Sequence, residues 1–253
     1  LVLLGLILAL TLQTDAAQYE CQHLPADYYE TITDYKEYLR AIAEMDVDAE
    51  FITYEDIAEL GEFRLTEEDL EALFYRLHDS GQLPWYTDYG YHYSTHHTTK
   101  LIAEIGPDYL DKETYNRALY EQRIAEVLAA CVFEGMTDLQ IALSLHDYLI
   151  TNCIYDDTFE KNTGYDLLIN GTTVCAGYTE LYRDLLNRSG VPCVSVISEP
   201  MEHTWNLVQI GGKWYHADLT WDDPSPDSYG YVNHDYFLVS DETVRGGEEH
   251  HYD

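Results

Sequence analysis

The sequence predicts an α+β fold in which a helix that carries a cysteine packs on an antiparallel sheet, behind a helical N-terminal extension. Two observations support this. Apolar residues recur at helical spacing through the first half of the chain and again after residue 137. From residue 194 onward, short runs of β-branched and aromatic residues follow, and Gly211-Gly212 separates two of them. Helices first and strands last is an order typical of α+β proteins.

The first residues predict a secretory signal peptide. Residues 1–12 are almost wholly apolar, and small residues follow at Thr14, Ala16 and Ala17. Twelve residues are too short to span a bilayer. We therefore assign residues 1–17 to a truncated signal peptide and expect a secreted or cell-surface protein.

Residues 18–135 are expected to form a mostly helical extension with an aromatic hairpin. The stretch 27–82 reads as helices with acidic faces. The aromatic run 85–93 predicts a strand, and residues 100–105 are its expected partner. A long helix over 112–131 completes this part of the chain.

The catalytic core is expected over residues 136–253, beginning with a helix that Thr137 caps and that runs to Asn152. Its apolar face includes His146, which we interpret as a buried structural residue. The histidines at 92, 96 and 97 lack the spacing of a helical zinc site, so we interpret them as surface residues. The prediction for metal ligands is therefore none.

A second core helix of about 15 residues begins at Cys175 and ends at Gly190. Strands are predicted over 194–198, 204–210 and 213–219. The last two are joined by Gly211-Gly212, a pair typical of a two-residue hairpin.

Cys175, His203 and Asp218 together predict thiol chemistry. If Gly211 and Gly212 form the turn, the numbers of paired residues sum to 423, and His203 and Asp218 become diagonal neighbours on one face. Such neighbours lie about 7 Å apart, which an imidazole–carboxylate hydrogen bond can span. A helix N-terminus favours the thiolate of Cys175. The set then comprises a nucleophile, a base and an orienting acid.

Four segments carry a resemblance to the transglutaminase-like superfamily of the papain-like fold, in its secreted bacterial form. They read LHDYLITNCIYD, GTTVCAGYTELYRDLLNRSGVPC, HTWNLVQIGGKWYHADLTWDDP and DYFLVSD, and cover roughly 100 residues. The resemblance implies that Cys175 is the nucleophile, His203 the base and Asp218 the orienting acid. Papain-like proteases place a Gln before the cysteine, where this chain has Asn170. The oxyanion donor stays open between Asn170, Tyr155 and the backbone amide of Cys175.

The two tryptophans beside the triad, Trp205 and Trp221, have two interpretations. They wall a substrate-binding cleft, or they pack in the core, and the sequence favours neither.

The predicted function is that of an exported cysteine-dependent amidase or peptidase, which acts on protein or peptide amides through an acyl-thioester and needs no cofactor. One alternative is a transglutaminase that crosslinks Gln to Lys. Another is a non-enzymatic surface module, for which 24 Tyr and 4 Trp offer binding surface.

Charge and cysteine content restrict the partners further. The chain has 13 Lys+Arg against 47 Asp+Glu, a net charge of -34, which excludes a nucleic-acid partner and disfavours anionic membranes. Besides Cys175 there are Cys21, Cys131, Cys153 and Cys193, which either pair as two disulfides or lie buried as small apolar residues.

Overall fold

The computed structural model describes residues 52–53 and 70–246, with gaps at 71–73, 76, 82, 84, 96, 99–101, 112–113 and 225–230. The described residues form two compact units, one up to Arg117 and one from Ala118 onward. The predicted signal peptide and most of the predicted acidic helices lie outside the described residues. The boundary proposed between extension and core at residue 135 stays a prediction.

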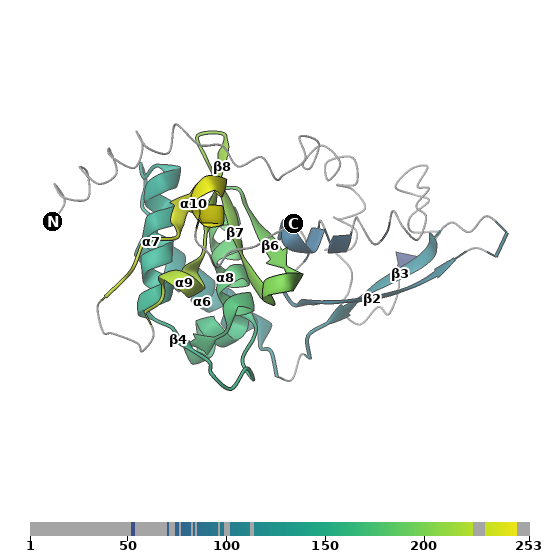
Figure 1. Ribbon diagram of the computed structural model, residues 1–253. Coiled ribbons are helices and arrows are strands. Elements are labelled where there is room, and N and C mark those ends of the chain that lie inside the picture. Colours follow the sequence, from purple (N-terminus) through teal and green to yellow (C-terminus); the bar gives the residue numbers. More distant parts are fainter. Residues whose placement is uncertain are drawn as a thin grey trace. The chain divides into compact units, whose positions relative to one another are not determined.

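The first unit contains the aromatic hairpin. Strands β2 (Thr87–Thr95) and β3 (Ile102–Tyr109) pair antiparallel, and β1 (Ile52–Thr53) joins the other edge of β3 (Figure 1). The predicted hairpin is confirmed, although both strands end later than expected. The prediction of helix throughout 27–82 is wrong at β1, because these two residues pair with β3 as a strand.

The second unit begins with two helices, α6 (Arg117–Cys131) and α7 (Asp138–Thr151). Thr137 caps α7 as predicted, and Gln140 completes a reciprocal capping box by accepting from the Thr137 N–H. His146 is fully buried on the inner face of α7. Within the described part of the chain, no helix has the length and apolarity needed to cross a membrane.

A four-stranded antiparallel sheet and helix α8 (Cys175–Arg188) form the centre of this unit. The strands are β6 (Cys193–Ser198), β7 (His203–Ile210), β8 (Lys213–Ala217) and β9 (Phe237–Val239), in that spatial order. Figure 1 shows α8 between α7 and the sheet. Three leucines of α8 are fully buried: Leu181, Leu185 and Leu186. The predicted α+β fold, with the cysteine-bearing helix packed on an antiparallel sheet, is therefore confirmed.

The hairpin of β7 and β8 has the predicted register. Asn206 pairs with Ala217 and Leu207 with His216, and both sums equal 423. Gly211 and Gly212 have φ values of 59° and 81°, a combination that glycine adopts without steric cost. The predicted strand 213–219 ends earlier, at Ala217, because the next residue instead caps the short helix α9 (Leu219–Asp222).

Short elements position the chain just before Cys175. Strand β4 (Ile154–Tyr155) pairs in parallel with β5 (Thr172–Thr173), and η2 (Asp166–Asn170) lies between them in sequence. After β6 comes η3 (Glu199–Met201), and α10 (Asp241–Gly246) closes the described chain.

Cys131, Cys153 and Cys193 are buried free thiols, which supports the interpretation as small apolar residues. Burial raises the pKa of Cys153 to about 12, so this thiol stays protonated. Cys21 lies outside the described residues.

Gly177, in the first turn of α8, is expected to tolerate no side chain. A Cβ there would overlap the backbone carbonyl of Thr163 and the hydroxyl of Thr173. Gly177→Ala should therefore lower the free energy of unfolding by about 1–3 kcal/mol, despite the better helix propensity of alanine. Chemical denaturation measures this change. Gly190→Ala adds a methyl group in open space at a positive φ and should cost only about 1–2 kcal/mol. An unfolding free energy raised by Gly177→Ala would contradict the overlap.

Candidate active site

Cys175 is the first residue of α8. The N-cap residue is Val174, whose side chain cannot accept a hydrogen bond. The N-cap side chain therefore does not bind the first amides of the helix. The β4–β5 pairing holds the chain immediately before the cysteine. The thiol is half-buried and retains access to solvent. This position combines a helix N-terminus with a reachable nucleophile.

His203 and Asp218 meet across the end of the hairpin. Nε2 of His203 lies 2.7 Å from Oδ2 of Asp218, and the two side chains are 9% and 3% exposed. The imidazole also acts on the thiol of Cys175 closely enough to lower the thiol pKa. Because Nε2 is committed to the carboxylate, Nδ1 is the ring nitrogen left for sulfur. The structure thus brings the three residues selected from the sequence together around the His203 imidazole.

The carboxylate of Asp218 is held from two sides. Its Oδ1 accepts the backbone N–H of Trp221 at 3.2 Å, which makes Asp218 the N-cap of α9. Its own backbone N–H donates to the carbonyl of Tyr236 at 3.1 Å. With the backbone anchored and Oδ1 taken, Oδ2 is directed at His203. The capping role explains why β8 ends where it does.

The pKa shifts of the pair favour a thiolate–imidazolium state. Burial raises the pKa of Cys175, but the hydrogen bond and charge of His203 and the amides of Thr204 and Ala176 outweigh it and lower the pKa overall. For His203, burial lowers the pKa, yet the contacts with Asp218 and Cys175 prevail and raise it to about 9. The thiol therefore loses its proton at a pH where the imidazole still holds one.

Trp205 supports the imidazole from the interior. It is 1% exposed, and its ring stacks on His203 with centroids 5.7 Å apart and planes at 23°. Its Nε1–H donates to Nδ1 of His216 at 2.8 Å, and Nε2 of His216 lies 3.0 Å from Oδ1 of Asp241. Sequence reasoning did not select His216 or Asp241. The sequence carries little signal for the His216–Asp241 contact, because the two residues lie 25 positions apart and meet only in the folded chain.

Trp221 is a second aromatic neighbour of the His203 imidazole. Its ring centroid is 6.1 Å from that of His203, and it packs edge-on against Tyr236. Trp221 is partly exposed, whereas Trp205 is buried. Of the two tryptophans selected from the sequence, Trp221 therefore has surface to offer a substrate, and Trp205 has almost none.

The three candidate oxyanion donors differ in their surroundings. The side-chain amide of Asn170 donates to Asp166 at 3.1 Å. Tyr155 lies close enough to Cys175 for the sulfur charge to help raise the phenol pKa, after the larger effect of burial, so the hydroxyl keeps its proton. The backbone amide of Cys175 lies in the first turn of α8, where the helix supplies no acceptor for it. The side chain of Asn170 is thus already engaged by a neighbouring carboxylate.

Comparison with known proteins covers this same region. The family model described as the transglutaminase-like superfamily matches residues 126–219, a range that contains Cys175, His203 and Asp218. Kyphoscoliosis peptidase from Mus musculus is 25% identical over 93 residues, and that from Homo sapiens is 24% identical over 116 residues. These matches cover 30% and 38% of this chain, but only 14% and 18% of the two relatives.

The chain thus spans less than a fifth of the curated relatives that it matches. Among solved structures, one described as the crystal structure of a TGase aligns with a TM-score of 0.36 and 12% identity. The alignment covers 64% of this chain and 50% of that one.

Proposed function

We propose, on the premise that residues 126–219 belong to the transglutaminase-like superfamily, that this chain is a cysteine-dependent amidase or peptidase acting on protein or peptide amides. The observation that carries the proposal is that one imidazole, His203, contacts the Asp218 carboxylate at 2.7 Å and also lowers the pKa of the Cys175 thiol. The apolar run at residues 1–12 supports placing the activity outside the cytoplasm, as a secreted or cell-surface enzyme.

The reaction begins with the thiolate of Cys175, which attacks the amide carbonyl carbon. Negative charge develops on the carbonyl oxygen, and we assign the Cys175 amide and the Tyr155 hydroxyl as its hydrogen-bond donors. The His203 imidazolium then gives its Nδ1 proton to the departing amine as the C–N bond breaks. The product is an acyl-thioester on Cys175.

The second half of the reaction releases the acyl group. Neutral His203 takes a proton from an incoming water molecule, whose oxygen attacks the thioester carbon. The C–S bond breaks, which restores the thiolate and the imidazolium. Asp218 stays ionised and holds Nε2 of His203 throughout.

The pH dependence of Cys175 alkylation tests this ion pair without a substrate. The rate with iodoacetamide should rise at a lower pH than that of an ordinary thiol, which ionises at about pH 8.5. The reason is that His203 lowers the Cys175 pKa. Amide cleavage needs the imidazolium as well, so it should decline as pH rises through about 9, while alkylation does not. Mass spectrometry of the labelled peptide assigns the rate to Cys175. If the alkylation rate instead follows the titration of an ordinary thiol, the ion pair is absent and the proposed function is contradicted.

A further inference from the structure

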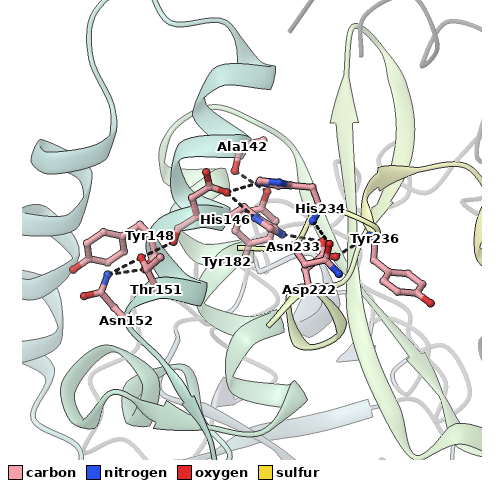
Figure 2. Close-up of polar contacts among 11 residues, drawn as sticks. Ala142, His146, Tyr148, Thr151, Asn152, Tyr182, Asp222, Asn233, His234 and Tyr236 are labelled. Atoms are coloured by element: carbon pink, nitrogen blue, oxygen red, sulfur yellow. Dashed lines mark hydrogen bonds and ion pairs between the residues drawn. The ribbon is translucent and has the colours of Figure 1, made fainter. Parts of the chain in front are cut away.

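A second cluster of chemically active side chains lies away from the catalytic thiol. His146 and Asp147 lie on α7, His234 lies in the segment before β9, and one ligand atom from each of the three converges on the same place. Figure 2 shows the two histidines. Oδ1 of Asp147 lies 3.1 Å from Nδ1 of His146 and 2.7 Å from Nε2 of His234. The three atoms lie within 4.8 Å of one another. We propose that these three side chains bind a first-row divalent cation of the Zn²⁺ class.

The donor set fits that class of ion. Two imidazoles and one carboxylate are borderline ligands that suit Zn²⁺ and its neighbours and do not suit Ca²⁺. Tetrahedral ligands about 2.0–2.1 Å from zinc lie about 3.4 Å apart. Binding would therefore lengthen the nitrogen–oxygen contacts of 3.1 and 2.7 Å, a shift that falls on the partly exposed side chains of Asp147 and His234. Three protein ligands leave a fourth position for water.

Asp222 supplies the outer partner that a metal-binding histidine requires. His146 and Asp222 are both 0% exposed, and Nε2 of the imidazole lies 3.1 Å from Oδ2 of the carboxylate. A carboxylate only accepts, so without a cation both ring nitrogens of His146 donate, Nε2 to Asp222 and Nδ1 to Asp147. A bound cation would replace the Nδ1 proton, while the Nε2–H group would still donate to Asp222. This arrangement matches the carboxylate–histidine–metal geometry that orients a ligand. The backbone N–H of Tyr236 holds the other oxygen of Asp222 at 2.9 Å (Figure 2).

The cluster has an apolar wall and an open side. Phe237 packs against both imidazoles, with ring centroids 4.8 Å from His146 and 5.9 Å from His234. The two imidazoles stack 5.2 Å apart. Asp147 and His234 are 42% and 36% exposed, so a hydrated cation can enter from solvent. The net charge of -34 raises the local cation concentration.

Such a cation would join α7 to the segment before β9, next to α9. That short helix carries Asp222 at one end and the capping Asp218 at the other, and the N–H of Asp222 donates to the Asp218 carbonyl at 3.1 Å. The site therefore shares an element with the catalytic carboxylate but none of its ligands with the triad.

The test uses the full chain with Cys175→Ala, because a thiol beside an imidazole can itself bind zinc. Titration with ZnCl₂ by calorimetry should give one site that raises the unfolding temperature. His234→Gln or Asp147→Asn, each partly exposed, should weaken that site at least about tenfold and abolish the thermal shift. His97→Gln, an exposed histidine of the other unit, should change neither.

Cobalt absorption gives an independent readout, since Co²⁺ bound by nitrogen and oxygen ligands should lose its ligand-field bands in His234→Gln. The proposal is overturned if Zn²⁺ does not bind, or if it binds His234→Gln and the parent protein equally. Because Cys175 is absent from every sample, these outcomes are independent of the proposed catalysis.

Discussion

Alanine in place of Cys175 is expected to abolish amide cleavage and leave the fold intact. The substitution removes only the sulfur, and alanine is a favourable residue at the start of α8. Without a thiolate no acyl-thioester forms, so cleavage of a peptide library, read by mass spectrometry, should fall to background. The same library reports which amide bonds the wild-type protein prefers.

The acceptor of the acyl group can be determined in the same experiment. If water is the acceptor, wild-type products carry new carboxyl termini or, at side-chain amides, acids one mass unit heavier. Adding a labelled primary amine in excess distinguishes a transglutaminase, because label then appears on glutamine side chains. Thermal unfolding of Cys175→Ala, which should match the wild type closely, is the control for folding. Library cleavage that survives Cys175→Ala would exclude thiol catalysis.

Removal of the Asp218 carboxylate is expected to have the second-largest effect. Asp218→Ala leaves Nε2 of His203 without its acceptor and α9 without its cap. We expect the specificity constant kcat/KM to fall roughly a thousandfold or more, and the unfolding free energy to fall by about 1 kcal/mol from the lost cap. Asparagine is only a partial replacement. Both carboxylate oxygens accept hydrogen bonds here, and an amide has one acceptor oxygen.

The alkylation profile shows whether this loss acts through the ion pair. Without the Asp218 charge, the His203 pKa should fall from about 9 toward the ordinary value of about 6.5, and the Cys175 pKa should rise. Glu134→Gln removes a charge from an exposed carboxylate between α6 and α7 and should leave the profile unchanged. An Asp218→Ala protein with the wild-type profile and activity within tenfold of wild type would rule out an orienting role.

The sequence predicted the β7–β8 hairpin because the physics there is local. Two adjacent glycines adopt the positive φ values of a tight turn, and a two-residue turn fixes the register of both strands. The start of α8 at Cys175 and the cap of α7 at Thr137 are equally local features. Strand β1 was missed because two residues carry too little periodicity, and only the pairing with β3 makes them a strand.

The position of Trp205 could not be predicted from its neighbours in sequence. Whether a tryptophan beside a triad faces substrate or core depends on which layer covers it, and burial is set by long-range packing. Here Trp205 is buried and donates a hydrogen bond to His216, which in turn hydrogen-bonds Asp241 of α10. Trp221, one turn after the cap of α9, keeps an exposed surface.

By itself, the sequence determined which residue types are available for thiol chemistry and which short elements carry them, because turns, caps and side-chain alternation depend on neighbouring residues. Only the tertiary structure decided which of these groups meet. It placed His203 against both Asp218 and Cys175, and it brought His146, Asp147, Asp222 and His234 together from elements up to 88 positions apart. Such meetings follow from packing α7, α8 and the sheet around one core, which no local pattern encodes.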